Sequence, residues 1–177
     1  MKEIQIESPP RTIMEVYKSL PEGTLAELID KVIYMSPAPL YKHQDILFEI
    51  AQALSIHLKK ENTGKLIISP FDVYLDNSSN AIQPDITVIL NSNPGKLEGQ
   101  FFGVPDLVVE ILSPGNKDHD LVKKRDLYER FGVKEYWVVD PETRVAQGFQ
   151  LKENRYADLA IQAGKIQSPL LSLTFSF

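Results

Sequence analysis

Residues 106–114 constrain the fold most, because their apolar run 107–112 contains one carboxylate, that of Glu110. A run of Leu, Val and Ile of this length is typical of a strand in the interior of a sheet. A charged side chain in such a strand is costly unless it is paired, hydrogen-bonded or bound to a metal. We therefore expect another part of the chain to supply a partner for Glu110, and we expect this strand to form the wall of an active site.

The segment after this strand predicts a helix and a second buried strand. Leu121, Tyr128 and Phe131 recur at helical spacing, and Gly132 is a typical residue for ending a helix. Residues 135–140 then have the composition of a strand. A strand, a helix and a strand in this order predict a right-handed crossover between two parallel strands.

Helix and strand patterns also fill the rest of the chain. A capping-box pair, Thr12 and Glu15, begins a short helix over residues 12–20, and apolar residues at helical spacing predict a long helix over residues 41–60. The other predicted segments are a hairpin over residues 24–36 with its turn at Asp30 and Lys31, a meander of strands over 65–69, 71–76 and 81–90, a loop over 91–103, and two or three edge strands over 145–177.

The composition fits one compact α/β or α+β domain spanning residues 1–177, because 43% of the residues are apolar and can form a sizeable core. The absence of cysteine excludes disulfides and thiolate-bound zinc, so any metal must have oxygen or imidazole ligands. The lack of a signal-peptide pattern and of a long uncharged apolar run predicts a cytoplasmic protein without a membrane segment. The net charge of −5 provides no overall attraction to nucleic acid.

Asp85 is the first candidate partner for Glu110. It follows Pro84, which cannot donate a hydrogen bond to a sheet, so Asp85 marks the edge or bend of the apolar strand that comes after it. Two neighbouring strands can bring both carboxylates to one point, which suits Mg²⁺ with oxygen ligands and several waters. The alternative is that Asp85 is a solvated turn residue and Glu110 a paired residue of an edge strand.

Lys124 is the candidate cation. Asp120, Lys124 and Tyr128 recur every four residues and therefore share one face of the predicted helix. A lysine delivered to a site with two carboxylates can orient a water and stabilise the charge that develops on a phosphate. The alternative is a surface ion pair between Asp120 and Lys124, and the spacing alone favours that simpler interpretation.

Several of these motifs together resemble the bacterial Uma-two family of restriction-endonuclease-like proteins, a branch of the PD-(D/E)XK nuclease superfamily. The resemblance covers nearly the whole chain, and its combined motifs are specific. It rests on residues 27–30, residues 37–39 with His43, Pro84 with Asp85, residues 105–114, residues 120–124 with Tyr128, and residues 132–141. It implies a restriction-endonuclease-like α/β (α+β) core, in which a central mixed sheet is flanked by helices.

The resemblance also implies roles for the candidate residues. Asp85 and Glu110 would be the metal ligands, and the carbonyl of Ile111 would add a further ligand. Leu112 stands where most of the superfamily has a lysine, and positions 110 and 112 of a strand face the same way, so another residue must supply the cation. Lys124 matches the lysine that similar family members carry on the following helix.

Glu27, His43 and Gln83 are further residues for which we expect a role near the site. By the resemblance, Glu27 would assist the metal or hold the site through a hydrogen bond, and His43 would meet a phosphate. Gln83 lies close to Asp85 in sequence and could orient that carboxylate. The alternatives are a strand-edge carboxylate for Glu27 and, for His43, a histidine at a helix start that is satisfied by backbone groups.

These observations predict a DNA endonuclease that depends on Mg²⁺ (or Mn²⁺) and hydrolyses phosphodiester bonds. The sequence contains neither a Gly-rich phosphate loop nor a serine-hydrolase elbow. The main alternative is a catalytically silent module with the same fold that binds nucleic acid or protein, and a third is a hydrolase of small phosphorylated substrates. The resemblance also makes a homodimer plausible, with the apolar tail 170–177 as either its interface or a core edge strand.

Overall fold

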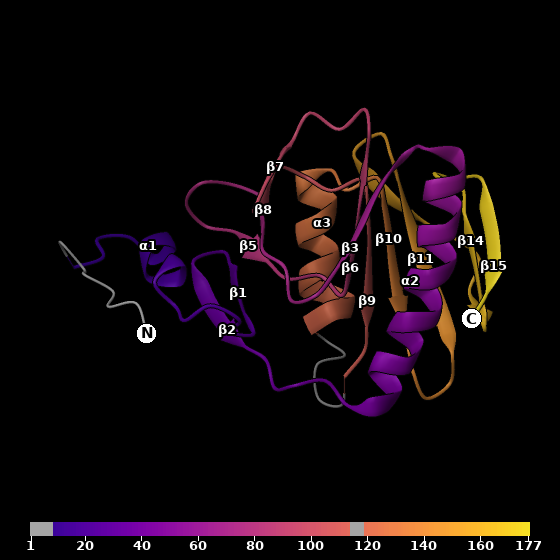
Figure 1. Ribbon diagram of the computed structural model, residues 1–177, viewed down its shortest axis with the longest axis horizontal. Coiled ribbons are helices and arrows are strands. Elements are labelled where there is room, and N and C mark those ends of the chain that lie inside the picture. Colours follow the sequence, from indigo (N-terminus) through magenta and orange to yellow (C-terminus); the bar gives the residue numbers. More distant parts are fainter. Residues whose placement is uncertain (1–8, 114–118) are drawn as a thin grey trace.

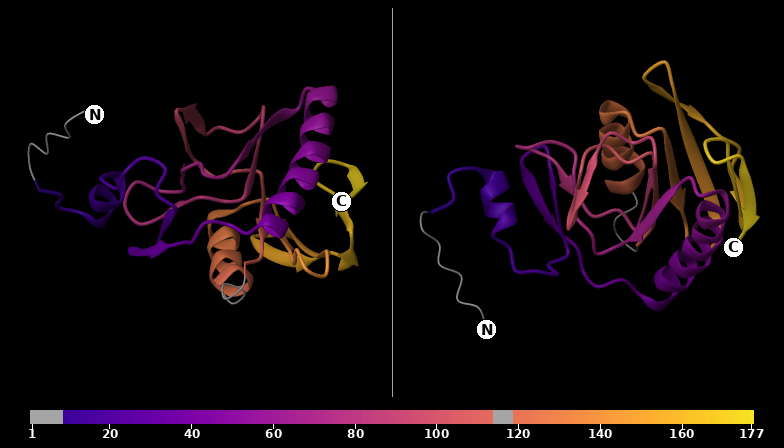
Figure 2. Two further views of the ribbon diagram at one scale, coloured as in Figure 1. Left: turned by 60° about the horizontal axis from the view of Figure 1, so that its bottom comes forward. Right: turned by 45° about the horizontal axis from the view of Figure 1, so that its top comes forward.

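The computed structural model describes residues 9–113 and 119–177 and shows a mixed α+β protein (Figure 1). Its central sheet has a helix on each face. Helix α2 (Tyr41–Glu61) packs on one face and α3 (Arg125–Phe131) on the other (Figures 1 and 2). This arrangement confirms the predicted fold class, a central mixed sheet flanked by helices.

The central sheet has the strand order β12, β11, β10, β9, β6, β3, and β13 pairs with β11. Strands β9 and β10 are parallel, and the other neighbouring pairs are antiparallel. The strand, helix and strand that follow one another from residue 107 to residue 139 therefore connect parallel neighbours, as predicted. The strands are β3 (Gly64–Ile68), β6 (Ile86–Leu90), β9 (Leu107–Ile111), β10 (Glu135–Val139), β11 (Val145–Lys152), β12 (Arg155–Asp158) and β13 (Gln162–Ala163).

The two faces of β9 belong to two different cores, because successive side chains of a strand point to opposite faces. Leu107 and Val109 belong to the core that α2 covers. Val108 and Leu112 belong to the core that α3 covers. Glu110 lies two residues from Val108 and two from Leu112, so its side chain points to the same face as theirs. The strand therefore directs the Glu110 carboxylate toward the α3 side of the sheet.

Local signals set the ends of the helices. Helix α1 (Ile13–Lys18) begins with the expected capping box, in which the side chains of Thr12 and Glu15 each accept a hydrogen bond from the other residue's backbone N–H. Helix α2 ends at Asn62 in the left-handed conformation. The segment before α3 is a π-helix, η1 (His119–Lys124), and not an extension of the α-helix. Within the described ranges, no helix combines the length and apolar content needed to cross a membrane.

The meander predicted from residue 65 to residue 90 is wrong. Strand β3 pairs directly with β6, while the short strands β4 (Val73–Tyr74) and β5 (Ala81–Ile82) form a hairpin in a second sheet. The predicted strand 81–90 is therefore divided between two sheets. Pro84 lies at the break, where it has no backbone N–H to contribute to a ladder.

The second sheet has the order β2, β1, β5, β4, β8, β7. Strands β1 (Ala26–Ile29) and β2 (Val32–Met35) form the predicted hairpin, with Asp30 and Lys31 at its turn, both at positive φ. Strand β1 also pairs with β5, which shortly precedes Asp85 in the chain. The second sheet thereby brings the N-terminal hairpin to the start of β6.

Two segments contain more strands than predicted. The expected loop over residues 91–103 includes the hairpin of β7 (Lys96–Glu98) and β8 (Gln100–Phe102). The tail forms five strands, β11 to β15, of which β14 (Lys165–Ser168) and β15 (Leu173–Ser176) make a separate two-stranded sheet. Leu171 and Phe177 are buried in the core on the α2 side, which favours the core interpretation of the tail.

Candidate active site

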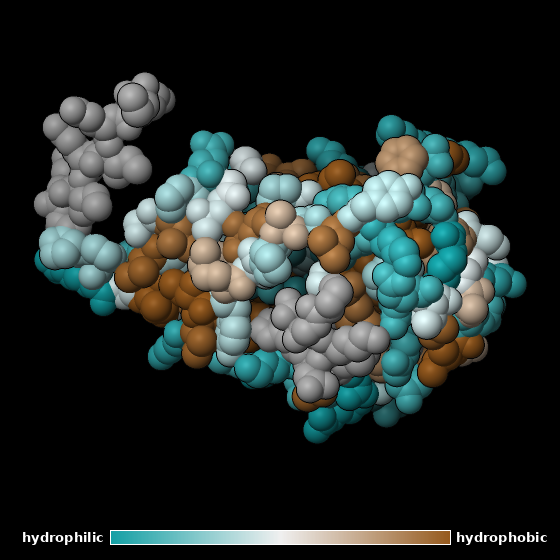
Figure 3. Space-filling view, turned by 90° about the horizontal axis from the view of Figure 1, so that it is seen from below, coloured by the Kyte–Doolittle hydropathy of each residue, from teal (hydrophilic) through white to brown (hydrophobic). Residues whose placement is uncertain are grey.

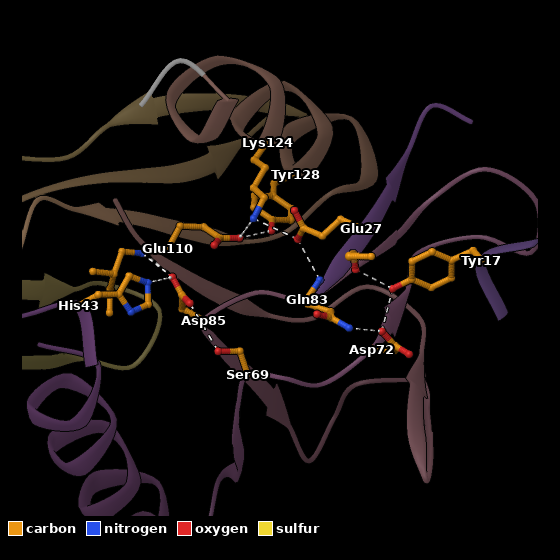
Figure 4. A network of polar contacts seen from close by, with 12 residues as sticks. Tyr17, Glu27, His43, Ser69, Asp72, Gln83, Asp85, Glu110, Lys124 and Tyr128 are labelled. Carbon is orange, nitrogen blue, oxygen red and sulfur yellow. Dashed lines mark hydrogen bonds and ion pairs between the residues drawn. The ribbon is translucent and has the colours of Figure 1, made fainter. Parts of the chain in front are cut away.

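A cleft of about 150 Å³ opens where the start of β6, the end of β9 and the N-terminus of α2 meet. Figure 4 shows the polar network that lies along it. The cleft is lined by all six residues singled out in the sequence, namely Glu27, His43, Gln83, Asp85, Glu110 and Lys124. The fold therefore brings the predicted site residues to one place, although they come from distant parts of the chain.

The rim of the cleft is apolar on the side of the N-terminal hairpin. Figure 3 shows one face of the molecule, on which apolar surface gathers over the end where β1 and β2 lie. Met35 of β2 is 65% exposed and lines the cleft, together with Pro37 and Pro39. This side of the cleft therefore has an apolar edge.

Glu110 is buried, and two groups on the α3 side contact its carboxylate. The Tyr128 hydroxyl donates to Oε1 over 2.6 Å, and Nζ of Lys124 lies 3.0 Å from the same oxygen. Burial, with the nearby carboxylates of Glu110 and Glu27, raises the pKa of Tyr128 well above its ordinary value of 10.0, so the hydroxyl remains a donor. Because β9 is an interior strand, the edge-strand alternative for Glu110 does not hold.

Lys124 is buried and bridges two carboxylates. Its Nζ lies 3.0 Å from Oε1 of Glu110 and 3.0 Å from Oε1 of Glu27, and its side chain is only 7% exposed. It is therefore not a surface lysine as the ion-pair alternative required, and the side chain of Asp120 lies outside the described residues. Leu112 packs into the core on the α3 side, so the cation reaches Glu110 from the π-helix before α3 and not from the strand.

Glu27 and Gln83 connect the cleft to the second sheet. Oε1 of Glu27, besides contacting Lys124, accepts a hydrogen bond from the backbone N–H of Gln83 over 2.9 Å. The Gln83 side-chain amide donates to Asp72 over 2.9 Å, and Figure 4 shows it directed toward that residue. Gln83 therefore holds Glu27 through its backbone and is not turned toward Asp85, as the sequence had led us to expect.

Asp85 lies at the other end of the network. Its Oδ2 accepts a hydrogen bond from the backbone N–H of Ile111 over 2.7 Å and lies 3.1 Å from Nε2 of His43. Its Oδ1 lies 3.5 Å from the Ser69 hydroxyl. The side chain is 14% exposed, so Asp85 is not a solvated turn residue. His43 contacts a carboxylate and not the backbone, and its buried Nδ1 has no hydrogen-bond partner in the part of the chain that the structure describes.

Four labelled members of this network had no role at the site in the sequence interpretation, and one of them, Tyr17, donates its hydroxyl to Asp72 over 2.8 Å. Tyr128 could have been found from its spacing, because it follows Lys124 by four residues and a helix then directs both side chains to one side. Ser69 and Asp72 carry no comparable signal. They reach Asp85 and Gln83 only because distant strands pair in the folded protein.

The donors in the cleft fit a hard divalent cation that keeps several of its waters. Asp85 and Glu110 offer carboxylate oxygens to one cleft, and Mg²⁺ commonly binds through one or two carboxylates. Over residues 9–113 and 119–177, no group of three or more His, Asp or Glu side chains is arranged to hold a metal by itself. The donor set therefore suits Mg²⁺ or Mn²⁺ better than a cation that needs many protein ligands.

Comparisons with known proteins connect this chain with a solved structure and with a family model. A crystal structure described as "a putative nuclease belonging to DUF820 from Anabaena variabilis ATCC 29413" matches with a TM-score of 0.75 and 21% identity, over 94% of this chain and 95% of that chain. This likeness establishes the fold. Residues 14–177 match the model of the Uma2 family, described as "Putative restriction endonuclease", and the chain belongs to this family. None of the curated proteins matches.

Proposed function

We propose that the protein is a Mg²⁺- or Mn²⁺-dependent endonuclease that hydrolyses phosphodiester bonds in DNA. The observation that carries this proposal is the contact between the buried Lys124 and Glu110 in the cleft that Asp85 also lines. Burying an ammonium and a carboxylate together is costly, so the presence of such a pair beside a cleft favours a chemical role. Membership of a restriction-endonuclease family supports nucleic acid as the substrate.

Asp85 and Glu110 are the residues that would hold the cation, with the carbonyl of Ile111 as a third candidate ligand. When bound, the cation would polarise a water and neutralise charge on the scissile phosphate. The side chains of Glu27, Asp85, Glu110 and Lys124 are three carboxylates and one ammonium, with a formal charge of −2. One divalent cation balances this charge.

Lys124 provides the positive charge that Leu112 cannot. In the proposed reaction its ammonium stabilises the charge that develops on the phosphate, as preorganised donors do in other hydrolytic sites. Glu27 keeps the ammonium in place, because it contacts Nζ at the same distance as Glu110. Tyr128 holds the Glu110 carboxylate by a hydrogen bond, and His43 does the same for Asp85.

The test is metal-dependent nicking of supercoiled plasmid DNA. Wild type and Asp85→Asn would be compared in Mg²⁺, Mn²⁺ and EDTA, with Asp158→Asn, an exposed aspartate on β12, as the matched control. We expect wild type and the control to nick DNA only with a metal, and Asp85→Asn to lose about 10³-fold in rate. Equal rates for wild type and Asp85→Asn, with both proteins folded by circular dichroism, would contradict the assignment.

Two other functions predict different outcomes in the same assay. A catalytically silent module would bind DNA or a protein without cleavage in any metal. The net charge of −5, which provides no overall attraction to DNA, favours the protein-binding form of this module. A hydrolase of small phosphorylated substrates would turn over a phosphate ester that competes with the plasmid. Cleavage of DNA that a phosphate ester does not inhibit would exclude both.

A further inference from the structure

The outer face of α2 carries apolar side chains that the fold does not cover. One side of this helix packs into the core through Ile46, Ile50 and Leu54. On the other side, Phe48 is 64% exposed and Ile56 is 62% exposed. Figures 1 and 2 show α2 at the outside of the molecule, where another protein can reach it. Large apolar residues on the second face of a helix whose first face is already buried indicate an interaction surface.

Phe48 and Ile56 belong to a single stripe of side chains along the helix. We call this surface the α2 stripe, which consists of Tyr41, Asp45, Phe48, Gln52, Ile56 and Lys59. At about 100° per residue, each of these side chains points within roughly 40° of the direction of Gln52. All six residues are exposed, and they extend over most of the 21 residues of α2.

The α2 stripe is complementary to a second copy of itself that runs in the opposite direction. Phe48 and Ile56 lie at equal distances on either side of Gln52, and so do Asp45 and Lys59. If two copies of α2 pack antiparallel with Gln52 at the twofold axis, Phe48 of each copy meets Ile56 of the other. Asp45 of each copy then meets Lys59 of the other. A parallel arrangement would instead place like charges together, so only the antiparallel one satisfies both the apolar and the charged positions.

Other partners fit this surface less well. Nucleic acid requires a basic surface, but the lysine of the stripe is matched by an aspartate, and the neighbouring Lys42 is paired with Glu142. A membrane surface requires a broad apolar face edged with basic residues, and the broad apolar face of α2 lies in the core. A second copy of the chain is therefore the partner that the charge pattern favours.

We propose that the protein forms a homodimer through the α2 stripe, with the two helices antiparallel and Gln52 at the twofold axis. The tail considered as an interface from the sequence has Leu171 and Phe177 in the core and is not needed for this contact. The proposal does not rest on the proposed nuclease function, because no residue of the α2 stripe lines the cleft.

Sedimentation of the full chain over a range of micromolar concentrations tests the apolar part of the proposal. We expect a monomer–dimer equilibrium for wild type, and for Phe48→Glu a rise of about 30-fold or more in the dimer Kd. The matched control is Ile161→Glu, which changes an equally exposed isoleucine outside α2 and should leave the Kd unchanged. A wild type that stays monomeric throughout this range, or a Phe48→Glu variant that dimerises as well as wild type, would overturn the proposal.

The charged positions test the orientation of the two helices. Asp45→Lys alone and Lys59→Asp alone should each weaken the dimer, because each places like charges opposite one another. The double variant Asp45→Lys/Lys59→Asp should restore the wild-type Kd. Weakening that persists in the double variant, in a protein that still unfolds at the wild-type temperature, would refute the antiparallel register.

A single-cysteine experiment locates the axis, and the chain is suited to it because it contains no cysteine. In Gln52→Cys the two thiols lie at the axis, so mild oxidation should link most of the dimer. In the control Gln44→Cys, the thiols would be separated by about 24 Å along the helices and should not be linked. Equal linking of both variants, or preferential linking of Gln44→Cys, would contradict the proposal.

Discussion

The two ends of β9 each carry a buried acid paired with a lysine, but the two pairs lie in different surroundings. Asp106, just before the strand, and Glu110, within it, are 1% and 3% exposed. Lys134 lies 2.7 Å from Asp106, and Lys124 lies 3.0 Å from Glu110. The two lysines differ, because the Lys134 side chain is 54% exposed and that of Lys124 only 7%.

The other partners of the two acids differ as well. Asp106 also accepts hydrogen bonds from the backbone N–H of Leu90 and the side-chain amide of Asn93, so it ties the segment after β6 to β9. Glu110 instead faces the cleft and is held by Tyr128. The pairing of an acid with a lysine therefore does not identify a chemical site by itself. A cation buried beside a cleft is the more informative feature.

Replacing each acid by its amide should separate the two roles most clearly. Glu110→Gln removes a proposed metal ligand, and we expect it to lower the rate of plasmid nicking by about 10³-fold. Asp106→Asn is the matched change at the other end of β9 and should leave the rate per folded molecule nearly unchanged. Single-turnover nicking, corrected for the folded fraction, measures both. Similar losses in the two variants would mean that the ends of β9 do not differ in function.

The two lysines offer a second, smaller contrast. Lys124→Met keeps the length of the side chain but removes the charge, and we expect a loss of about 10²-fold in the nicking rate because the developing charge on the phosphate is no longer stabilised. Lys134→Met removes a half-exposed charge away from the cleft and should cut DNA at the wild-type rate. If Lys124→Met is as active as Lys134→Met, the lysine has only a structural role.

The structural role of Asp106 should appear in the stability of the protein. Asp106→Ala leaves the backbone N–H of Leu90 and the amide of Asn93 without their acceptor, so we expect the free energy of unfolding to fall by about 2 to 4 kcal/mol. Lys134 adds little to this loss, because its exposed ammonium can be hydrated. Urea unfolding measures the change, with Asp158→Ala on the exposed side of β12 expected to stay within about 0.5 kcal/mol of wild type. A loss for Asp106→Ala no larger than for this control would show that Asp106 is not a structural residue.

Local sequence patterns predicted the elements that carry Glu110 and Lys124. The apolar run of β9, the helical spacing up to Gly132 and the apolar run of β10 are each visible within a few residues. The four-residue spacing also indicated that Lys124 and Tyr128 share a face. What it could not indicate is that this face meets Glu110, because that depends on how the helix packs on the sheet.

The remaining errors have the same physical origin. Residues 81–90 look like one strand, and only the pairing of their two halves with different partners divides them between two sheets. Likewise, Asp106 precedes the apolar run that contains Glu110, and the sequence does not show which of their lysines is buried. Contacts such as that between Glu27 and Lys124 join distant parts of the chain, so no local pattern reports them.

Glu135 extends the comparison to a third buried acid, on the strand parallel to β9. Its carboxylate accepts hydrogen bonds from neutral donors, the indole N–H of Trp137 over 2.7 Å and the backbone N–H of Leu170 over 2.8 Å. Burial raises the pKa of Glu135 above its ordinary value of 4.5, although hydrogen bonds from Ser168, Trp137 and Leu170 oppose the shift. Burial among these neutral donors thus favours the protonated form of this acid.

The smallest effect we predict is the pH dependence that this raised pKa imposes. Below the ordinary value of 4.5, Glu135 is protonated in both states, so its contribution to stability is fully present. As the pH rises, the unfolded chain loses the proton first, and this contribution falls until the pH has passed the native pKa. Glu135→Gln has no carboxyl group to ionise at this position. The free energy of unfolding of this variant, relative to that of wild type, should therefore increase with rising pH and then become constant. Urea unfolding from about pH 4 to pH 8 measures this difference. For the control Glu153→Gln, at an exposed position, the difference from wild type should stay constant over the same pH range. If the free energy of unfolding of wild type instead increases relative to that of Glu135→Gln as the pH rises, the direction inferred for the pKa of Glu135 is wrong.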